Sequence, residues 1–403
     1  MPLSSSTPRY AIGEALITTT LIQVLATAAA LAFAPIAMTA ARDIGVAPSA
    51  IGYQISLIYL AGAFGSAVAG RMIARVGAIG VEKIALLLFA CGMLALAVAQ
   101  VGVVILGSIV IGLGYGIQNP ASAEILGAVS PAHRRNVIFS VKQAGVPLGA
   151  VLISLALPCM DEAIGWRAAL TLLALAPLAL TAGLHVLHPG NSQERPVKPL
   201  AHRSFLVEQK RVWTNHQWRS LAIICLAFSA AQLSLSVFAG LTLMETGHFT
   251  MIAAAAATGL MQLCGATGRI FWGWCSDRTG SGFGVLVIIG LIGTAAMLAM
   301  AGLAVMPTAV QIALICLLGF CLSGWNGVAI AEMTRNCDAS DTGAIVGAIL
   351  LYTFLGVIVG PSLFALAYGV FDLYRLVFAC ASAIMAVGMA AALQSVRRGR
   401  LVR

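Results

Sequence analysis

Long apolar stretches separated by short polar ones dominate the chain. Ten of these stretches contain no Asp, Glu, Lys, Arg or His: 15–41, 44–70, 84–123, 143–160, 168–184, 220–244, 249–268, 279–331, 342–371 and 376–396. A helix needs about 20 apolar residues to cross the hydrocarbon core of a bilayer. The stretches 84–123 and 279–331 are long enough for two crossings each, so the pattern predicts twelve membrane-spanning segments.

Each crossing must be a helix, because backbone N–H and C=O groups find no hydrogen-bond partners in lipid. The composition agrees with this prediction. Hydrophobic residues make up 60% of the chain and charged residues only 9%, whereas soluble domains carry about 25% charged residues. We therefore predict an all-α membrane protein with 12 transmembrane helices.

The basic residues lie mostly on one side of the predicted membrane. With the N-terminus placed inside, cytoplasmic segments hold 20 of the 23 Lys and Arg residues, and only Arg42, Arg167 and Arg375 fall outside. This is the positive-inside bias, so we predict cytoplasmic termini and a multi-pass protein of the inner membrane of a bacterial cell. The net charge of +9 is thus a signal of topology, and we expect the lipid bilayer as a partner and no nucleic acid.

The longest polar stretch, 188–219, divides the predicted spans six and six. Its prolines and mixed charges indicate a cytoplasmic linker. Within it, SFLVEQKRVW has the composition of a helix at the lipid interface, although a plain tether is the simpler interpretation. We predict an N-terminal six-helix bundle at 1–187, the linker at 188–219 and a C-terminal six-helix bundle at 220–403.

Two motifs recur in both halves. GRMIARVG at 70–77 and GWCSDRTG at 273–280 lie 203 positions apart, and GIQNPASAE at 116–124 and GWNGVAIAE at 324–332 lie 208 apart. Two parallel repeats joined by a loop are the plan of a secondary transporter, with the substrate site between the repeats near the midplane. We therefore expect two pseudo-symmetric bundles. The glycines that bound the first motif are Gly70, Gly77, Gly273 and Gly280.

The first of these motifs resembles the GxxxDRxG signature that follows the second span of each half in the major facilitator superfamily. The second-half copy, with Asp277 and Arg278, matches it, whereas the first-half copy has Ala74 in place of the aspartate. The resemblance, together with the span count, the central loop and the repeat, covers nearly the whole chain. It implies a carrier that works by alternating access.

The charges of these motifs suggest a gate. We predict the pairs Arg75–Glu124 and Arg278–Glu332, each holding one bundle shut on the cytoplasmic side. Asp277 would face a helix N-terminus, that of the fifth span, where a negative charge is favoured. The alternative is that each is a solvated loop charge with no fixed partner.

Arg269 lies eight residues before Asp277, hence about 12 Å into its helix. A charge inside the bilayer usually faces a cavity or a partner, and a guanidinium suits a carboxylate; snorkelling to the headgroups is the alternative. The region resembles that of oxalate–formate exchangers and monocarboxylate transporters, which implies a substrate-binding arginine four residues before Gly273. Proton-coupled monocarboxylate carriers have an Asp where this chain has Gly265.

Lys142 lies seven residues after Arg135, about 10 Å into the fifth span. It is a candidate second cation on the substrate path, and snorkelling or pairing with Glu124 is the alternative. Further polar residues in the spans could line the same cavity, although such residues are more often hydrogen-bonding glue between helices. These candidate substrate-binding residues are Asn119, Gln143, Gln262, Tyr115, Tyr352, Asn326 and Gln23.

The sequence contains no motif of enzyme chemistry, phosphate binding or metal ligation, and its nine cysteines are scattered. We expect no catalytic residues, no cofactor and no metal. Two functions remain: a monomeric carrier of a small organic anion such as a carboxylate, or a proton-driven exporter of drugs or other hydrophobic compounds. Exporters usually need a membrane-embedded acid, and the acids Glu14, Glu124 and Glu332 lie near span ends. We therefore favour the anion carrier, with a proton as candidate coupling ion.

Overall fold

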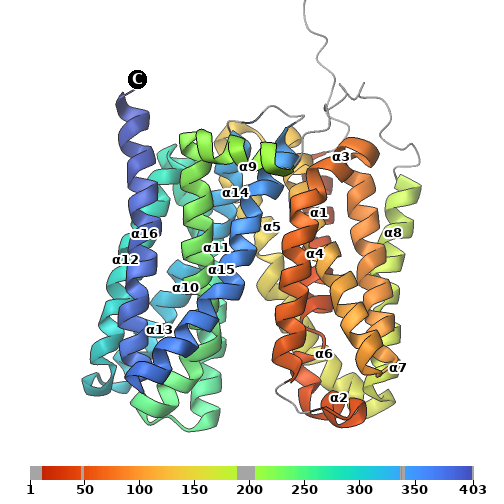
Figure 1. Ribbon diagram of the computed structural model, residues 1–403, viewed down its shortest axis with the longest axis horizontal. Helices are drawn as coiled ribbons and strands as arrows, with labels where there is room; N and C mark the ends of the chain where they lie inside the picture. Colours follow the sequence, from red (N-terminus) through yellow and green to blue (C-terminus); the bar gives the residue numbers. More distant parts are fainter. Residues whose placement is uncertain (1–10, 47–49, 188–204, 336, 338–340, 402–403) are drawn as a thin grey trace, which may run out of the picture.

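The computed structural model describes residues 11–46, 50–187, 205–335, 337 and 341–401, and these ranges form an all-helical molecule (Figure 1). The helices of the first half are α1 (Ile12–Ala30), α2 (Ala37–Ile44), α3 (Ala50–Ala97), α4 (Val101–Val129), α5 (Arg135–Gln143), α6 (Gly145–Ile164), α7 (Trp166–Leu173) and α8 (Leu175–Leu187). Short 3-10 turns lie at Ala34–Ile36 and Ala132–Arg134.

The second half begins with α9 (Phe205–Thr214), which belongs to the predicted linker; residues 188–204 lie outside the described ranges. It continues with α10 (His216–Gly247), α11 (Met251–Thr279), α12 (Gly282–Ala299), a 3-10 segment (Met300–Val305), α13 (Thr308–Leu322), α14 (Trp325–Arg335), α15 (Thr342–Phe371) and α16 (Tyr374–Leu401). The predicted helix in SFLVEQKRVW is confirmed by α9.

Ten segments of the described chain are long and apolar enough to cross a membrane. One of them, α3, holds two crossings, because its backbone bends at Gly77, where φ is 73°, a region that favours glycine. Helix α11 has 29 residues but carries Arg269, Asp277 and Arg278, and it is not among the ten. Counting both parts of α3 and adding α11 gives the twelve crossings that the sequence predicts.

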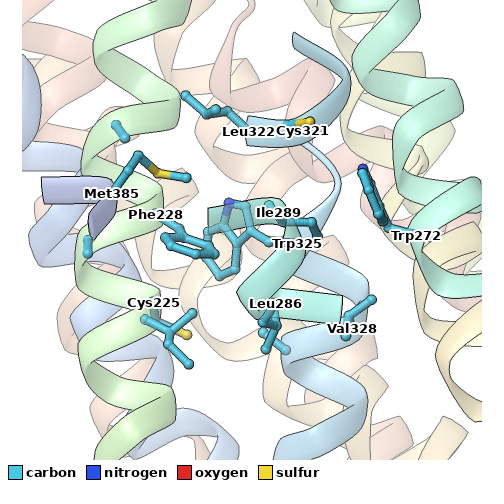
Figure 2. Close-up of a cluster of buried hydrophobic side chains, with 14 of the residues drawn as sticks. Cys225, Phe228, Trp272, Leu286, Ile289, Cys321, Leu322, Trp325, Val328 and Met385 are labelled. Atoms are coloured by element: carbon cyan, nitrogen blue, oxygen red, sulfur yellow. The ribbon is translucent and has the colours of Figure 1, made fainter. Parts of the chain in front are cut away.

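Two clusters of buried hydrophobic side chains form the core: the larger belongs mainly to the second half but includes Leu126 and Phe139, and the other belongs to the first half with Phe354 added. The core of the second half centres on Trp325, whose ring meets that of Phe228 edge to face at 6.0 Å between centroids (Figure 2). Leu286 and Met385 lie around the same indole, so α10, α12, α14 and α16 pack together there. The fully buried Phe89, in the second part of α3, belongs to the separate core of the first half.

The two halves meet near the ends of the helices that the charge pattern places in the cytoplasm, called here the cytoplasmic end. A Cβ on Gly70 would lie 2.5 Å from Cα of Ala344, and a Cβ on Gly273 would collide with the side chain of Ser140. The first glycine of each repeated motif therefore permits α3 and α11 to approach the opposite half closely. Helix α9 lies across the same end (Figure 1).

Candidate substrate-binding site

A buried lysine organises the polar groups of the first half. The Nζ atom of Lys142, which is only 2% exposed, donates to Oε1 of Gln23 (2.7 Å), Oε1 of Gln118 (3.4 Å) and Oδ1 of Asn119 (2.5 Å). An ammonium group has three N–H donors and no acceptor. Three side-chain oxygens from α1 and α4 thus match the three donors of a charged lysine on α5.

Arg269 reaches this cluster from the other half of the molecule. Its side chain is 3% exposed, and Nη1 donates to the backbone carbonyl of Gln143 at 2.9 Å. The regular helical donor to that carbonyl would be the amide of Pro147, but proline has no N–H. The sequence around the junction of α5 and α6 therefore leaves a carbonyl available to the arginine, which points between the halves and not to the headgroups.

The arginine has hydrogen-bonding capacity left over. Its Nε atom has no hydrogen-bond partner among the described residues, and no ion pair of Arg269 occurs within the described part of the chain. The side chain of Gln143 donates to Oδ1 of Asn119 at 3.3 Å, so the predicted residues Arg269, Gln143, Asn119 and Lys142 form one continuous group. An anion bound here would lie near two cations, Lys142 and Arg269, and the Nε–H group of Arg269 would be available to donate to it.

Three aromatic rings lie beside this group. Tyr59 and Tyr115 of the first half and Phe354 of α15 have ring centroids 5.9 to 6.5 Å apart. Tyr115 lies one helical turn before Asn119 on the same helix, α4. The predicted site residue Tyr115 therefore joins the cationic group to an aromatic wall that both halves build.

A buried acid also belongs to the cluster. Glu82 on α3 is 1% exposed, its Oε1 accepts a 2.6 Å hydrogen bond from Ser122, and it interacts electrostatically with Lys142. Glu82 lies near the cytoplasmic end of its span, as Glu14, Glu124 and Glu332 do, but it is buried, and the sequence pattern did not single it out. Glu82 precedes Lys83 at the edge of an apolar stretch, which makes it resemble a solvated end of a span. The sequence does hold one sign of its burial. Glu82 follows Gly77, the glycine at the bend, and therefore lies within the second part of α3.

The remaining predicted residues lie elsewhere. Asn326 and Trp325 both donate to Oε1 of Gln232 on α10 at 3.1 Å. Gln232 is not among the predicted residues, although it lies 209 positions after Gln23 and the repeat could have revealed it. Gln262 is exposed, two turns from Arg269 along α11. These three amides remain candidates for a wider cavity.

Tyr352 does not join the cluster, which corrects the prediction. Its hydroxyl donates to Oε1 of Gln209 at 2.7 Å and accepts from Nε1 of Trp213 at 2.6 Å. Both partners are on α9, and Arg211 of the same helix forms an ion pair with Asp341 at 2.6 Å. Tyr352 therefore attaches the linker helix to the N-terminal part of α15.

The gate is partly as predicted. Asp277 accepts hydrogen bonds from the amides of Asn136 (3.0 Å) and Val137 (2.8 Å) and from the Asn136 side chain (2.7 Å). The prediction that it faces the N-terminus of the fifth span is confirmed. The last glycines of the two motifs, Gly77 and Gly280, both have positive φ, 73° and 66°, so each ends its helix where other residues would be strained.

The predicted Arg278–Glu332 pair is not formed between these two described residues. Glu332 pairs with Arg335 at 3.3 Å, three residues along its own helix, and the Arg278 guanidinium lies 5.5 Å from the ring centroid of Trp274. In the other half, Oε2 of Glu124 lies against Gly343 at the N-terminus of α15. The Arg75–Glu124 pair stays a prediction.

Comparison with known proteins agrees with this architecture. The model of the Major Facilitator Superfamily matches residues 16–361. The chain therefore belongs to the major facilitator superfamily of membrane transporters, whose members are generally non-enzymatic carriers.

One relative matches along most of its length. The gallate transporter of Pseudomonas putida is 25% identical over 393 residues, covering 88% of this chain and 87% of the relative. Among solved structures, the human organic anion transporter MFSD10 (TETRAN) has a TM-score of 0.76 at 13% identity, covering 95% of this chain and 100% of that one. The fucose:proton symporter FucP of E. coli has a TM-score of 0.74 at 16% identity, with 94% and 97% covered. At these identities the two structures show the shared fold.

Proposed function

We propose that the protein carries a small organic anion with a carboxylate group across the membrane by alternating access. The observation that carries the proposal is Arg269, a cation buried between the halves without an acidic partner among the described residues. Such a charge is costly unless it is paired. A carboxylate would supply the missing partner through charge-assisted hydrogen bonds.

The aromatic wall favours a carboxylate attached to a ring. Tyr59, Tyr115 and Phe354 offer edge and face contacts beside the two cations, and aromatic pairs of this kind contribute about 0.5–1.5 kcal/mol beyond burial. A relative named for gallate, an aromatic carboxylate, supports the same class. We therefore propose an aromatic monocarboxylate as substrate, held by Arg269 with Lys142 and Asn119 nearby.

The exporter of hydrophobic compounds is the second candidate. Glu82 supplies the buried acid that the sequence analysis did not find, so the absence of such an acid no longer counts against an exporter. The buried group still holds two cations, Arg269 and Lys142, and only one acid, Glu82. This excess of positive charge is the reason to prefer an anionic substrate. A neutral hydrophobic compound would leave Arg269 without a partner.

The test is thermal stability of the purified protein with benzoate, and with benzamide as the neutral isostere. Ligand that binds only the folded state stabilises it, by about 2.7 kcal/mol at a hundred times Kd. We expect benzoate to raise the Tm and benzamide to leave it unchanged. Arg269→Gln should remove the benzoate effect, whereas Arg71→Gln, an exposed arginine of α3, should keep it. Equal stabilisation by benzamide would contradict the proposal and favour the exporter.

A further inference from the structure

Glu82 borders a small pocket at the cytoplasmic end of the first half. The pocket lies between α1, α3, α4 and α8, and its lining includes Glu14, Thr18, Thr19, Ile79, Glu82 and Leu184. It offers about 20 Å³ of room for the centres of water molecules, and one buried water needs roughly 10–15 Å³ measured in this way. A water molecule can therefore reach the wall that Glu82 forms.

The carboxylate of Glu82 is only half satisfied by the protein. Oε1 accepts from Ser122 at 2.6 Å, whereas Oε2 is buried with no hydrogen-bond partner among the described residues. A buried carboxylate oxygen without a donor is costly. A proton on this oxygen would remove the charge and with it most of the cost of burying the group.

Two charged groups face Glu82 from neighbouring helices. Glu14 of α1 lines the same pocket, and Lys142 of α5 interacts with Glu82 electrostatically from the other side. The facing positions of α4 and α8 are neutral, Ser122 and Leu184 among them, and Lys83 follows on α3 itself. Lys142 is thus the cation that stabilises the ionised form of Glu82.

The same lysine lies in the anion site. A chain of side chains connects the two places: Ser122 donates its one hydroxyl hydrogen to Glu82, its oxygen lies 3.5 Å from Oε1 of Gln118, and that oxygen accepts from Lys142. An anion bound beside Lys142 would compete with Glu82 for the positive charge. The ionised form of Glu82 would then lose part of its stabilisation.

We propose that Glu82 is a proton-binding site linked to the anion site through Lys142. Binding of the anion is accompanied by uptake of one proton from the bulk solution: a hydronium ion gives its proton to the Glu82 carboxylate and becomes water, and Glu82 becomes a neutral carboxyl. The proposal rests on the proposed function for its ligand, while the proton site itself stands on the geometry of α3 and α4. Because linkage is reciprocal, a lower pH should strengthen anion binding.

Two measurements on the full-length purified protein test the proposal. The first is infrared difference spectroscopy without ligand, which detects the C=O stretch of a protonated carboxyl. Between about pH 8 and about pH 6, where exposed carboxylates stay ionised, we expect a band in the wild type that is lost in Glu82→Gln and kept in Glu162→Gln, an exposed acid of α6. In Ser122→Ala, which lacks the hydroxyl donor, the band should appear at higher pH.

The second measurement is the Kd of benzoate over the same pH range. Uptake of one proton should weaken binding by up to about tenfold per unit rise of pH in the wild type and Glu162→Gln, and the dependence should vanish in Glu82→Gln. Benzoate binding with the same pH dependence in Glu82→Gln would overturn the linkage while leaving the proposed function intact. Absence of a Glu82-dependent band would overturn the proton site. A Glu82-dependent band without benzoate binding would support the proton site and overturn the proposed function.

Discussion

Ser66 on α3 and Arg269 on α11 occupy equivalent positions of the repeat, 203 residues apart. Each reaches into the opposite half: Ser66 donates to the carbonyl of Gly347 and Arg269 to the carbonyl of Gln143, both at 2.9 Å. The serine hydroxyl has one donor and uses it, whereas a guanidinium has five. Both residues therefore make the same contact between the halves. Ser66 only closes the interface, whereas Arg269 also keeps donors for a ligand.

The helices that receive these contacts differ as well. Gly149 and Gly356 lie 207 positions apart within matching LG pairs, which aligns Lys142 with Ile349. Ile349 is fully buried among apolar neighbours. The interface is thus similar in its backbone geometry and different in its charge. The repeat provides the closure, and substitutions on one side of it provide the site.

The largest effect should come from Arg269. Replacing it with glutamine removes charge-assisted hydrogen bonds worth about 1.5–3 kcal/mol, so benzoate uptake into proteoliposomes should fall by roughly 10- to 100-fold in kcat/KM. Arg269→Lys keeps the charge but loses the planar fork and should lie between. Arg269→Gln should fold, because removing the charge relieves a desolvation cost. Normal uptake by Arg269→Gln would contradict the assignment of the site.

Asp277 should come next. Asp277→Ala leaves the amides of Asn136 and Val137 without their acceptor, and we expect this to destabilise the cytoplasm-closed form by about 1–3 kcal/mol. Distances between spin labels on the cytoplasmic ends of α4 and α14 would report the shift toward opening. Asp161→Ala, at the far end of α6, is the control. An unchanged distance distribution in Asp277→Ala would show that this contact does not hold the gate.

Ser66→Ala tests the other member of the comparison. Loss of the neutral hydrogen bond to Gly347 should favour opening by about 0.5–1.5 kcal/mol in the same spin-label measurement. The intrinsic Kd for benzoate in the closed form should not change, since Ser66 offers no spare donor. A loss of benzoate affinity as large as that of Arg269→Gln would mean that the two positions do not differ in function.

The smallest effect should come from Pro147→Ala. The new amide N–H can donate to the carbonyl of Gln143 and compete with Arg269, although a carbonyl oxygen has two lone pairs and can accept both. We expect benzoate binding to weaken by only about two- to threefold, measured by calorimetry. Pro158→Ala in the same helix, away from the arginine, should bind normally. A stronger loss than that of Arg269→Gln would show that the proline acts through helix shape.

The sequence predicted the fold well because hydrophobic length, basic bias and repeated glycines are local signals. It also singled out Arg269, Lys142 and Asn119, since a charge or amide within an apolar span is visible in one dimension. It failed where the position of a side chain depends on which other helix packs against it. Tyr352 lies against α9 because that helix crosses the N-terminal part of α15, and the repeat spacing could not show this.

One wrong prediction, the Arg278–Glu332 pair, and one missed residue, Glu82, have the same origin. Glu332 pairs with Arg335 because one helical turn separates them, a contact that competes with the predicted partner Arg278. Glu82 is buried because α1, α4 and α8 surround it, and no property of its neighbours in the sequence records that. Burial of a charge near the end of a span depends on which helices pack against it.

Two buried cations, Arg269 and Lys142, and one buried acid, Glu82, belong to one connected group, so the net charge of that group depends on what binds. A monocarboxylate that enters with one proton adds no net charge, whereas one that enters alone carries a negative charge with it. A membrane voltage does work of about 2.3 kcal/mol on each elementary charge per 100 mV. An inside-negative cell would therefore repel the anion alone, and would accumulate the anion with its proton at no electrical cost.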